Sequence, residues 1–297
     1  MIRHRTLHRS LTIAPLLGLL ALITTACGGP GADAESADAD MASEAETVDV
    51  AAIVEQLPSA IVGNGGELAG SAVSYVPGDD ATVGYLSVPE GEGPFPALII
   101  VHEWNGLVDR VRQVADDLAD EGYVVLAADL YAGRTGANPE ENMALVQEVN
   151  ADPETMVANL DAAVALLRAR DDVTGRVGTM GWCFGGGVVL SFGLDGVNHE
   201  ATAIFYGRLL DDPDALQAMD HEVYGTFASE DSGPSPEQVE AFETALDAAG
   251  VAHDLHIYDD VNHGFWLRVD QNAELRAEPA LDAWERLKAY LDRTLRN

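Results

Sequence analysis

The stretch RVGTMGWCFGGG, residues 176–187, decides the fold of this chain. Residues 181–185 match the pattern Gly-x-nucleophile-x-Gly, with Cys183 at the centre. This pattern is informative where a strand precedes it and a helix follows, and the apolar spacing predicts a strand over 176–180 and a helix over 184–192. The thiol then lies on a strained turn at the carboxyl end of a sheet, where the helix N-terminus stabilises a thiolate. The alternative is a buried structural Cys.

Strands and helices alternate on both sides of this stretch. The continuous apolar runs Ala97–Val101 and Val124–Ala128 are typical of strands buried on both faces, and helical spacing marks Val108–Asp120. The other expected strands are Val73–Val76, Ala81–Val88, Ala201–Tyr206, Val223–Ala228 and His253–Tyr258; the other expected helices are Ala51–Gln56, Glu140–Asn150, Pro153–Arg170, Pro213–Met219, Pro236–Ala249 and Pro279–Leu295. The sequence therefore predicts one α/β domain over residues 51–297, with a mostly parallel sheet covered by helices on both faces.

A Cys nucleophile needs a His to handle its proton, and the His needs a carboxylate. Where a nucleophile lies on such a turn, the chain order is nucleophile, acid, His, and the His follows the last strand. His263 fits this order, because it lies just past the last predicted strand. His253 and His256 lie inside that strand, while His199 and His221 lie in polar loops and are expected to be solvated.

The acid is expected after the second strand that follows the nucleophile. Asp231 lies three residues beyond that strand, Val223–Ala228, and Glu230 is its neighbouring competitor. Asp259 and Asp260 are close to the predicted His in sequence, but sequence proximity says little about side-chain geometry. Asp231 is therefore the predicted acid.

A second carboxylate, Glu103, follows the strand Ala97–Val101 at the same end of the sheet. A carboxylate there is costly to bury unless it is paired or used. At this point several motifs together resemble those of the dienelactone hydrolase family, over about residues 81–295. These are His102-Glu103-x-x-Gly106, Asp129-Leu130-Tyr131, Gly181-Trp-Cys-Phe-Gly-Gly186, the Asp231 loop and His263-Gly-Phe265.

The resemblance implies an α/β-hydrolase fold and a carboxylic ester hydrolase of the carboxymethylenebutenolidase type. It implies a triad of Cys183, His263 and Asp231 that cleaves a small lactone or ester through a thioester acyl-enzyme. It also implies that Glu103 contacts the thiol and helps to form the thiolate when substrate arrives.

Further site residues follow from the same resemblance. The backbone N–H groups of Trp104 and Phe184 would form the oxyanion hole. The family binds a substrate carboxylate through Arg residues, which points to Arg134 and Arg268, with Tyr131 near them. The alternative for both Arg residues is a solvated surface position.

The expected partner is a small ester or lactone, with no cofactor and no metal, and a monomer is expected. One rival interpretation is a general carboxylesterase or thioesterase acting on another small ester. A second is a non-catalytic binding protein displayed on a hydrolase fold, which the ordered Cys, Asp and His argue against. A third is a thiol redox protein, which the lack of a resolving Cys argues against.

The composition excludes a further class of partner. The chain has 50 acidic residues against 16 Lys and Arg, so its formal charge is −34. Such a surface repels phosphate backbones, so nucleic acid is not an expected partner. Hydrophobic residues make up 47% of the chain, enough for a sizeable core.

The first 27 residues have the features of an export signal. Three Arg precede the apolar stretch Leu11–Ile23, and small residues lead to Cys27, as in a bacterial lipobox. Residues 28–50 contain seven acids and no base, which predicts a disordered tether. We therefore expect an exported lipoprotein, membrane-anchored only through Cys27. An ordinary secretory signal cut near Ala26 is the alternative.

Lipidation of Cys27 can be tested directly. Mass spectrometry of the protein from its native host should find an N-terminal Cys27 that carries a diacylglyceryl group. A secreted protein with a different first residue would contradict the prediction.

Overall fold

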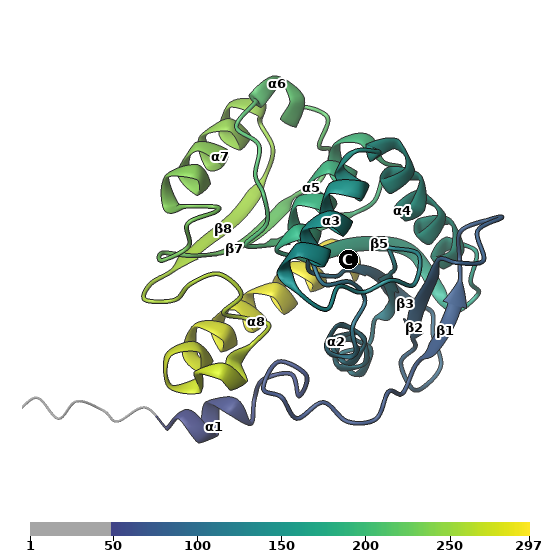
Figure 1. Ribbon diagram of the computed structural model, residues 1–297, viewed down its shortest axis with the longest axis horizontal. Coiled ribbons are helices and arrows are strands. Elements are labelled where there is room, and N and C mark those ends of the chain that lie inside the picture. Colours follow the sequence, from purple (N-terminus) through teal and green to yellow (C-terminus); the bar gives the residue numbers. More distant parts are fainter. Residues whose placement is uncertain (1–48) are drawn as a thin grey trace, which may run out of the picture. The chain divides into compact units, whose positions relative to one another are not determined.

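The computed structural model describes residues 49–297, which belong to one compact unit (Figure 1). The predicted leader with Cys27, and all but the last two residues of the predicted tether, lie outside the described residues. The strands are β1 Ser71–Ser74, β2 Val83–Ser87, β3 Phe95–Val101, β4 Val124–Ala128, β5 Val173–Trp182, β6 Ala201–Phe205, β7 Val223–Ala228 and β8 His253–Tyr258. The helices are α1 Val50–Val54, α2 Asp109–Asp120, α3 Pro139–Asn150, α4 Pro153–Arg168, α5 Phe184–Asp195, α6 Pro213–Leu216, α7 Pro236–Ala249 and α8 Ala273–Leu295, with a 3₁₀ turn at Val269–Gln271.

The strands form one sheet in the order β1-β2-β4-β3-β5-β6-β7-β8. The pairs from β4 to β8 are parallel, whereas β1 and β2 add an antiparallel edge. This agrees with the predicted mostly parallel sheet. All the parallel strands end at the same edge of the sheet, so the loops that follow β3, β5, β6, β7 and β8 meet there.

Helices cover both faces of the sheet, as the apolar strand pattern requires. Figure 1 shows α2 and α8 on one side and α4, α5 and α7 on the other. Side chains of β3 alternate between the two cores: Leu98 and Ile100 pack towards α2 and α8, while Ile99 and Val101 pack towards α4 and α5. Among the described helices, none is both long and apolar enough to cross a membrane.

The last helix begins earlier than predicted. Pro favours the first turn of a helix, which is why the sequence suggested a start at Pro279, yet α8 begins at Ala273 and contains that residue. Pro removes one backbone hydrogen bond from a helix interior. Tertiary contacts hold the extra turn, because Arg276 donates to the carbonyl oxygen of Arg268 at 2.8 Å and Ala277 is buried.

The expectation that His199 and His221 are solvated is wrong. Both side chains are buried at the amino end of the sheet, with their ring centroids 4.6 Å apart. The hydroxyl oxygen of Thr202 lies 3.0 Å from Nε2 of His199 and 2.8 Å from Nε2 of His221. Burial lowers the pKa of His199 to about 4, with the His221 ring adding to this effect, so this ring is neutral at pH 7. The polar loop residues around these His did not reveal that the rings point inwards.

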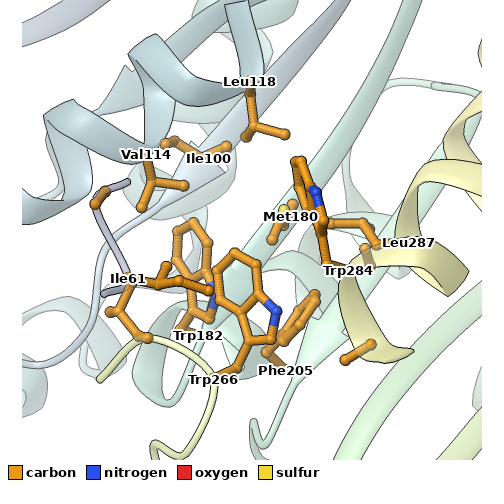
Figure 2. Close-up of a cluster of buried hydrophobic side chains, with 14 of the residues drawn as sticks. Ile61, Ile100, Val114, Leu118, Met180, Trp182, Phe205, Trp266, Trp284 and Leu287 are labelled. Carbon is orange, nitrogen blue, oxygen red and sulfur yellow. The ribbon is translucent and has the colours of Figure 1, made fainter. Parts of the chain in front are cut away.

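A cluster of Trp and Phe side chains connects the sheet to α8 and to the loop after β8. Figure 2 shows Trp182, Phe205, Trp266 and Trp284 packed together. The rings of Trp182 and Trp266 are stacked at 5.8 Å, and Trp266 lies 5.0 Å from Phe205. Trp266 is only three residues past His263, so this packing anchors the loop that carries His263.

Replacing Trp266 tests this anchor. Because Trp266 is fully buried, we expect Trp266→Ala to lower the free energy of unfolding by about 3–5 kcal/mol, measured by urea denaturation. Trp266→Phe should cost clearly less, because it keeps an aromatic ring and removes an indole N–H that has no partner among the described residues. A loss below about 1 kcal/mol for the Ala variant would refute the anchoring role.

Candidate active site

Cys183 lies on the sharp turn between β5 and α5. Its backbone has φ 55° and ψ −116°, a region that non-Gly residues rarely adopt. Hydrogen bonds on both sides hold this conformation. The Cys183 N–H donates to the carbonyl oxygen of Phe205 at 3.0 Å, and the Cys183 carbonyl accepts from Gly186 and Gly187 at 3.1 and 3.3 Å. A strained residue fixed in this way presents a partly exposed thiol at the edge of the sheet.

The glycines around Cys183 are required by close backbone contacts. A Cβ at Gly181 would lie 2.3 Å from the carbonyl oxygen of Gly185. A Cβ at Gly185 would lie 2.3 Å from the carbonyl oxygen of Val101 at the end of β3. Helix α5 can therefore approach β5 and β3 only because these two positions lack side chains.

His263 and Asp231 meet at the same end of the sheet. Nδ1 of His263 lies 2.6 Å from Oδ2 of Asp231, and the other Asp231 oxygen accepts the Gly233 N–H at 2.8 Å. The Asp231 carboxylate is buried, whereas the His263 side chain is 36% exposed. Since Nδ1 is occupied by Asp231, Nε2 is the nitrogen left to serve the nucleophile.

The surroundings of His263 favour its protonated form. Burial disfavours the charged ring, but hydrogen bonds with Asp231 and Cys183, together with their negative charges, raise the pKa of His263 to about 10. A pKa this far above neutral favours the imidazolium form of the ring at neutral pH, next to the thiol that the sequence predicts to be the nucleophile. A thiolate–imidazolium pair is the form in which a Cys nucleophile reacts.

Glu103 is buried beside these groups and forms an ion pair with Arg268. Burial raises the pKa of Glu103, while the positive charges of Arg268, His263 and Arg110 act in the opposite direction. A carboxylate buried at this position is expected to be paired or used, and the partner of Glu103 comes from the loop after β8. Arg268 thus reaches the site, although 165 residues separate it from Glu103.

The backbone N–H groups of Trp104 and Phe184 belong to the segments that follow β3 and β5, at the edge of the sheet where Cys183 lies. Phe184 is the first residue of α5, and the first N–H groups of a helix have no acceptor within the helix. The Trp104 N–H donates to no acceptor in the part of the chain that the structure describes. Tyr131 fixes the Trp104 peptide, because its buried hydroxyl donates to the Trp104 carbonyl oxygen at 3.1 Å.

Arg134 pairs with Glu148 and not with the predicted catalytic residues. Its guanidinium donates to both carboxylate oxygens of Glu148, at 2.9 and 2.7 Å, and the side chain is about half exposed at 49%. Within residues 49–297, no hydrogen bond or ion pair connects Arg134 with Cys183, His263 or Glu103. Of the two Arg candidates, the structure brings only Arg268 together with the predicted catalytic residues.

Two further side chains, Tyr206 and His102, border the site. Neither received a role from the sequence, although His102 is part of the His102-Glu103-x-x-Gly106 motif. Tyr206 follows β6 with φ 39°, and its ring meets that of His263 at 5.0 Å. His102 is buried, and its Nδ1 lies 2.6 Å from the Glu103 carbonyl oxygen while its Nε2 accepts the Leu130 N–H at 3.3 Å. Their position in the sequence could have revealed both residues, since each directly follows an apolar strand that ends at this edge of the sheet.

Comparison with known proteins finds relatives of this chain. A family model described as the dienelactone hydrolase family matches residues 82–295. A protein of Methylorubrum extorquens with the provisional name carboxymethylenebutenolidase is 30% identical over 229 residues, which are 72% of this chain and 78% of the relative. One of Synechocystis with the same provisional name is 30% identical over 233 residues, covering 72% and 92%. The crystal structure of a provisionally named dienelactone hydrolase from Klebsiella pneumoniae has a TM-score of 0.66 at 23% identity, covering 75% of this chain and 98% of that one.

The chain belongs to the dienelactone hydrolase family. The expected α/β-hydrolase fold is confirmed, and the chain is a hydrolase whose family implies a small-molecule substrate. Membership of this hydrolase family argues against the interpretation of the chain as a non-catalytic binding protein.

The raised pKa of His263 can be measured by NMR. We expect its ring to titrate with a midpoint near pH 10 in the folded protein. Because this pKa lies above the ordinary value of 6.5, the proton stabilises the folded state fully below about pH 6.5, and this stabilisation is lost as the pH rises to about 10. Asp231→Asn removes one of the two supporting negative charges and should lower the midpoint. A midpoint near 6.5 that Asp231→Asn leaves unchanged would contradict this account.

Proposed function

We propose that this enzyme hydrolyses a small lactone or ester by covalent catalysis, with Cys183 as nucleophile, His263 as acid and base, and Asp231 as the orienting carboxylate. The observation that carries the proposal is the 2.6 Å contact between Nδ1 of His263 and Oδ2 of Asp231, which leaves Nε2 of the ring free to serve the thiol of Cys183. A buried structural thiol would need neither partner.

The proposed reaction has two stages. The thiolate of Cys183 attacks the ester carbonyl, and the N–H groups of Trp104 and Phe184 hold the oxyanion that forms. When the carbon–oxygen bond breaks, the imidazolium of His263 gives its proton to the leaving enolate or alkoxide. Water then attacks the thioester with the neutral ring as base, which releases the acid and restores the thiolate–imidazolium pair.

Glu103 is suited to controlling the first step. In this structure its carboxylate is engaged by Arg268, and burial raises its pKa and so favours its uptake of a proton. We propose that, where Cys183 is still a thiol, a substrate group which draws Arg268 away frees Glu103 to accept the thiol proton, and that Glu103 releases this proton again when the product leaves. Binding of substrate would then complete the formation of the thiolate.

We also propose that the enzyme works outside the cytoplasm, tethered by a lipid on Cys27. This part rests on the sequence of residues 1–50 alone, where a basic and apolar leader ends at Cys27 and an acidic segment follows.

Replacing the nucleophile tests the proposed mechanism. We expect Cys183→Ala to lower turnover of a panel of enol-lactones and aryl esters by at least about a thousandfold, because no covalent intermediate can form. The thermal midpoint should be unchanged. In the wild type, acid quenching during turnover should reveal an acyl adduct on Cys183 by mass spectrometry.

Two outcomes would overturn the proposal. One is a Cys183→Ala variant within about tenfold of wild-type activity at an unchanged midpoint. The other is wild-type turnover that leaves no adduct on Cys183 but leaves one on another residue. The panel also separates the two substrate classes, because a general carboxylesterase would prefer aryl esters to enol-lactones.

A further inference from the structure

Arg208 differs from every other Arg that the structure describes. Nine of those Arg residues pair with a carboxylate. Two more, Arg176 and Arg276, donate to backbone carbonyl oxygens. Arg208 is exposed and makes neither kind of contact within residues 49–297. This is unexpected, because residues 51–297 contain 43 acidic side chains and only 13 Lys and Arg.

Arg208 is held against the first turn of α5, next to the nucleophile. A Cβ at Gly187 would lie 3.2 Å from the Cβ of Arg208, and a Cβ at Gly207 would lie 2.4 Å from the carbonyl carbon of Gly186. The Gly-x-nucleophile-x-Gly pattern ends at residue 185, so it does not require a glycine at position 187. A glycine there allows the backbone of Arg208 to lie directly beside the helix.

A cavity of about 230 Å³ lies between this loop, α5 and the helices α3 and α4. Phe184, the residue after Cys183, forms part of its wall. Its rim carries two exposed polar side chains, Arg208 and Asn150. Its floor is apolar and buried, and is formed by Met156, Val188 and Leu190.

The walls of this cavity contain no Asp or Glu. Three other cavities of the described residues have carboxylates in their walls, including the one of about 310 Å³ that Arg134 lines. The carboxylates of that cavity are Asp79, Glu148 and Asp152. On such an acidic protein, a cavity with one free guanidinium and no carboxylate selects an anion.

We infer that this cavity is the specificity pocket of the enzyme and takes an apolar substrate group that carries a carboxylate. The apolar part would lie on Met156, Val188 and Leu190, and the carboxylate would accept hydrogen bonds from Arg208 and Asn150 at the rim. Phe184 connects the pocket to the reaction, because it lines the cavity, directly follows Cys183 in the chain and carries one of the two proposed oxyanion donors. The inference rests on the proposed hydrolysis at Cys183.

Two matched esters test the pocket. The 4-nitrophenyl ester of adipic acid carries a free terminal carboxylate, and that of adipamic acid carries a neutral amide of the same size. We expect the full-length enzyme to prefer the carboxylate by at least about tenfold in kcat/KM, the size typical of a charge-assisted hydrogen bond. Arg208→Gln should abolish this preference, mainly through KM, and leave hydrolysis of the amide ester within about twofold.

Arg168→Gln is the matched control. This Arg pairs with Glu200 at the amino end of β6, away from Cys183, so its loss should leave the preference intact. An equal loss on both esters in Arg208→Gln would show a structural role and overturn the inference. A preference that survives in Arg208→Gln but disappears in Arg134→Gln would assign the anion to the other cavity and also overturn it.

A binding measurement separates this inference from the proposed function. Calorimetry of the Cys183→Ala variant with hexanoate and hexanamide needs no turnover. We expect Arg208→Gln in that background to weaken hexanoate binding at least about tenfold and to leave hexanamide unchanged. If wild type cleaves neither ester while this difference is seen, the proposed chemistry fails and the pocket stands. If the esters are cleaved but hexanoate binding does not depend on Arg208, only the pocket fails.

Discussion

The hydrogen bond from the Cys183 N–H to the Phe205 carbonyl oxygen is the contact around which the rest of the site is arranged. It fixes a residue with positive φ between a buried strand and a helix. Such a conformation costs free energy and persists only where its surroundings leave no alternative. Here the surroundings are the backbone contacts of Gly181 and Gly185, which bring α5 against β5 and β3. A side chain at either position would displace the helix and with it the Phe184 N–H.

Although the chain as a whole is strongly acidic, the buried carboxylates near Cys183 are paired with basic side chains. Two buried carboxylates, Asp231 and Glu103, each have a cationic partner from the loop after β8. Both pairs therefore depend on one segment, and the stacking of Trp266 on Trp182 holds that segment against the sheet. Core packing and active-site electrostatics are thus coupled through a few residues. A rearrangement of this loop would disturb both the acid–base pair and the Glu103 ion pair.

The two helix layers contribute differently to the site. The layer of α2 and α8 packs on the aromatic cluster, and this cluster supports the loop that carries His263. The layer of α4, α5 and α7 packs on the other face, and a cavity lies in it beside Phe184. The proposed nucleophile and the proposed substrate pocket are therefore connected through one residue, Phe184.

The sequence by itself determined the succession of strands and helices along the chain and the turn at Cys183, because buried strands and the Gly-x-Cys-x-Gly pattern are local signals. It also predicted His263 and Asp231 as partners, and the structure brings their side chains into contact. It could not determine side-chain pairing across long separations. That Arg268 pairs with Glu103 while Arg134 pairs with Glu148, and that His199 and His221 point inwards, depends on how distant loops meet. The start of α8 was missed for the same reason, since contacts from Arg276 support a turn that Pro279 alone would disfavour. Only the tertiary structure decides such features, because free energies of pairing and burial depend on neighbours that the sequence order does not reveal.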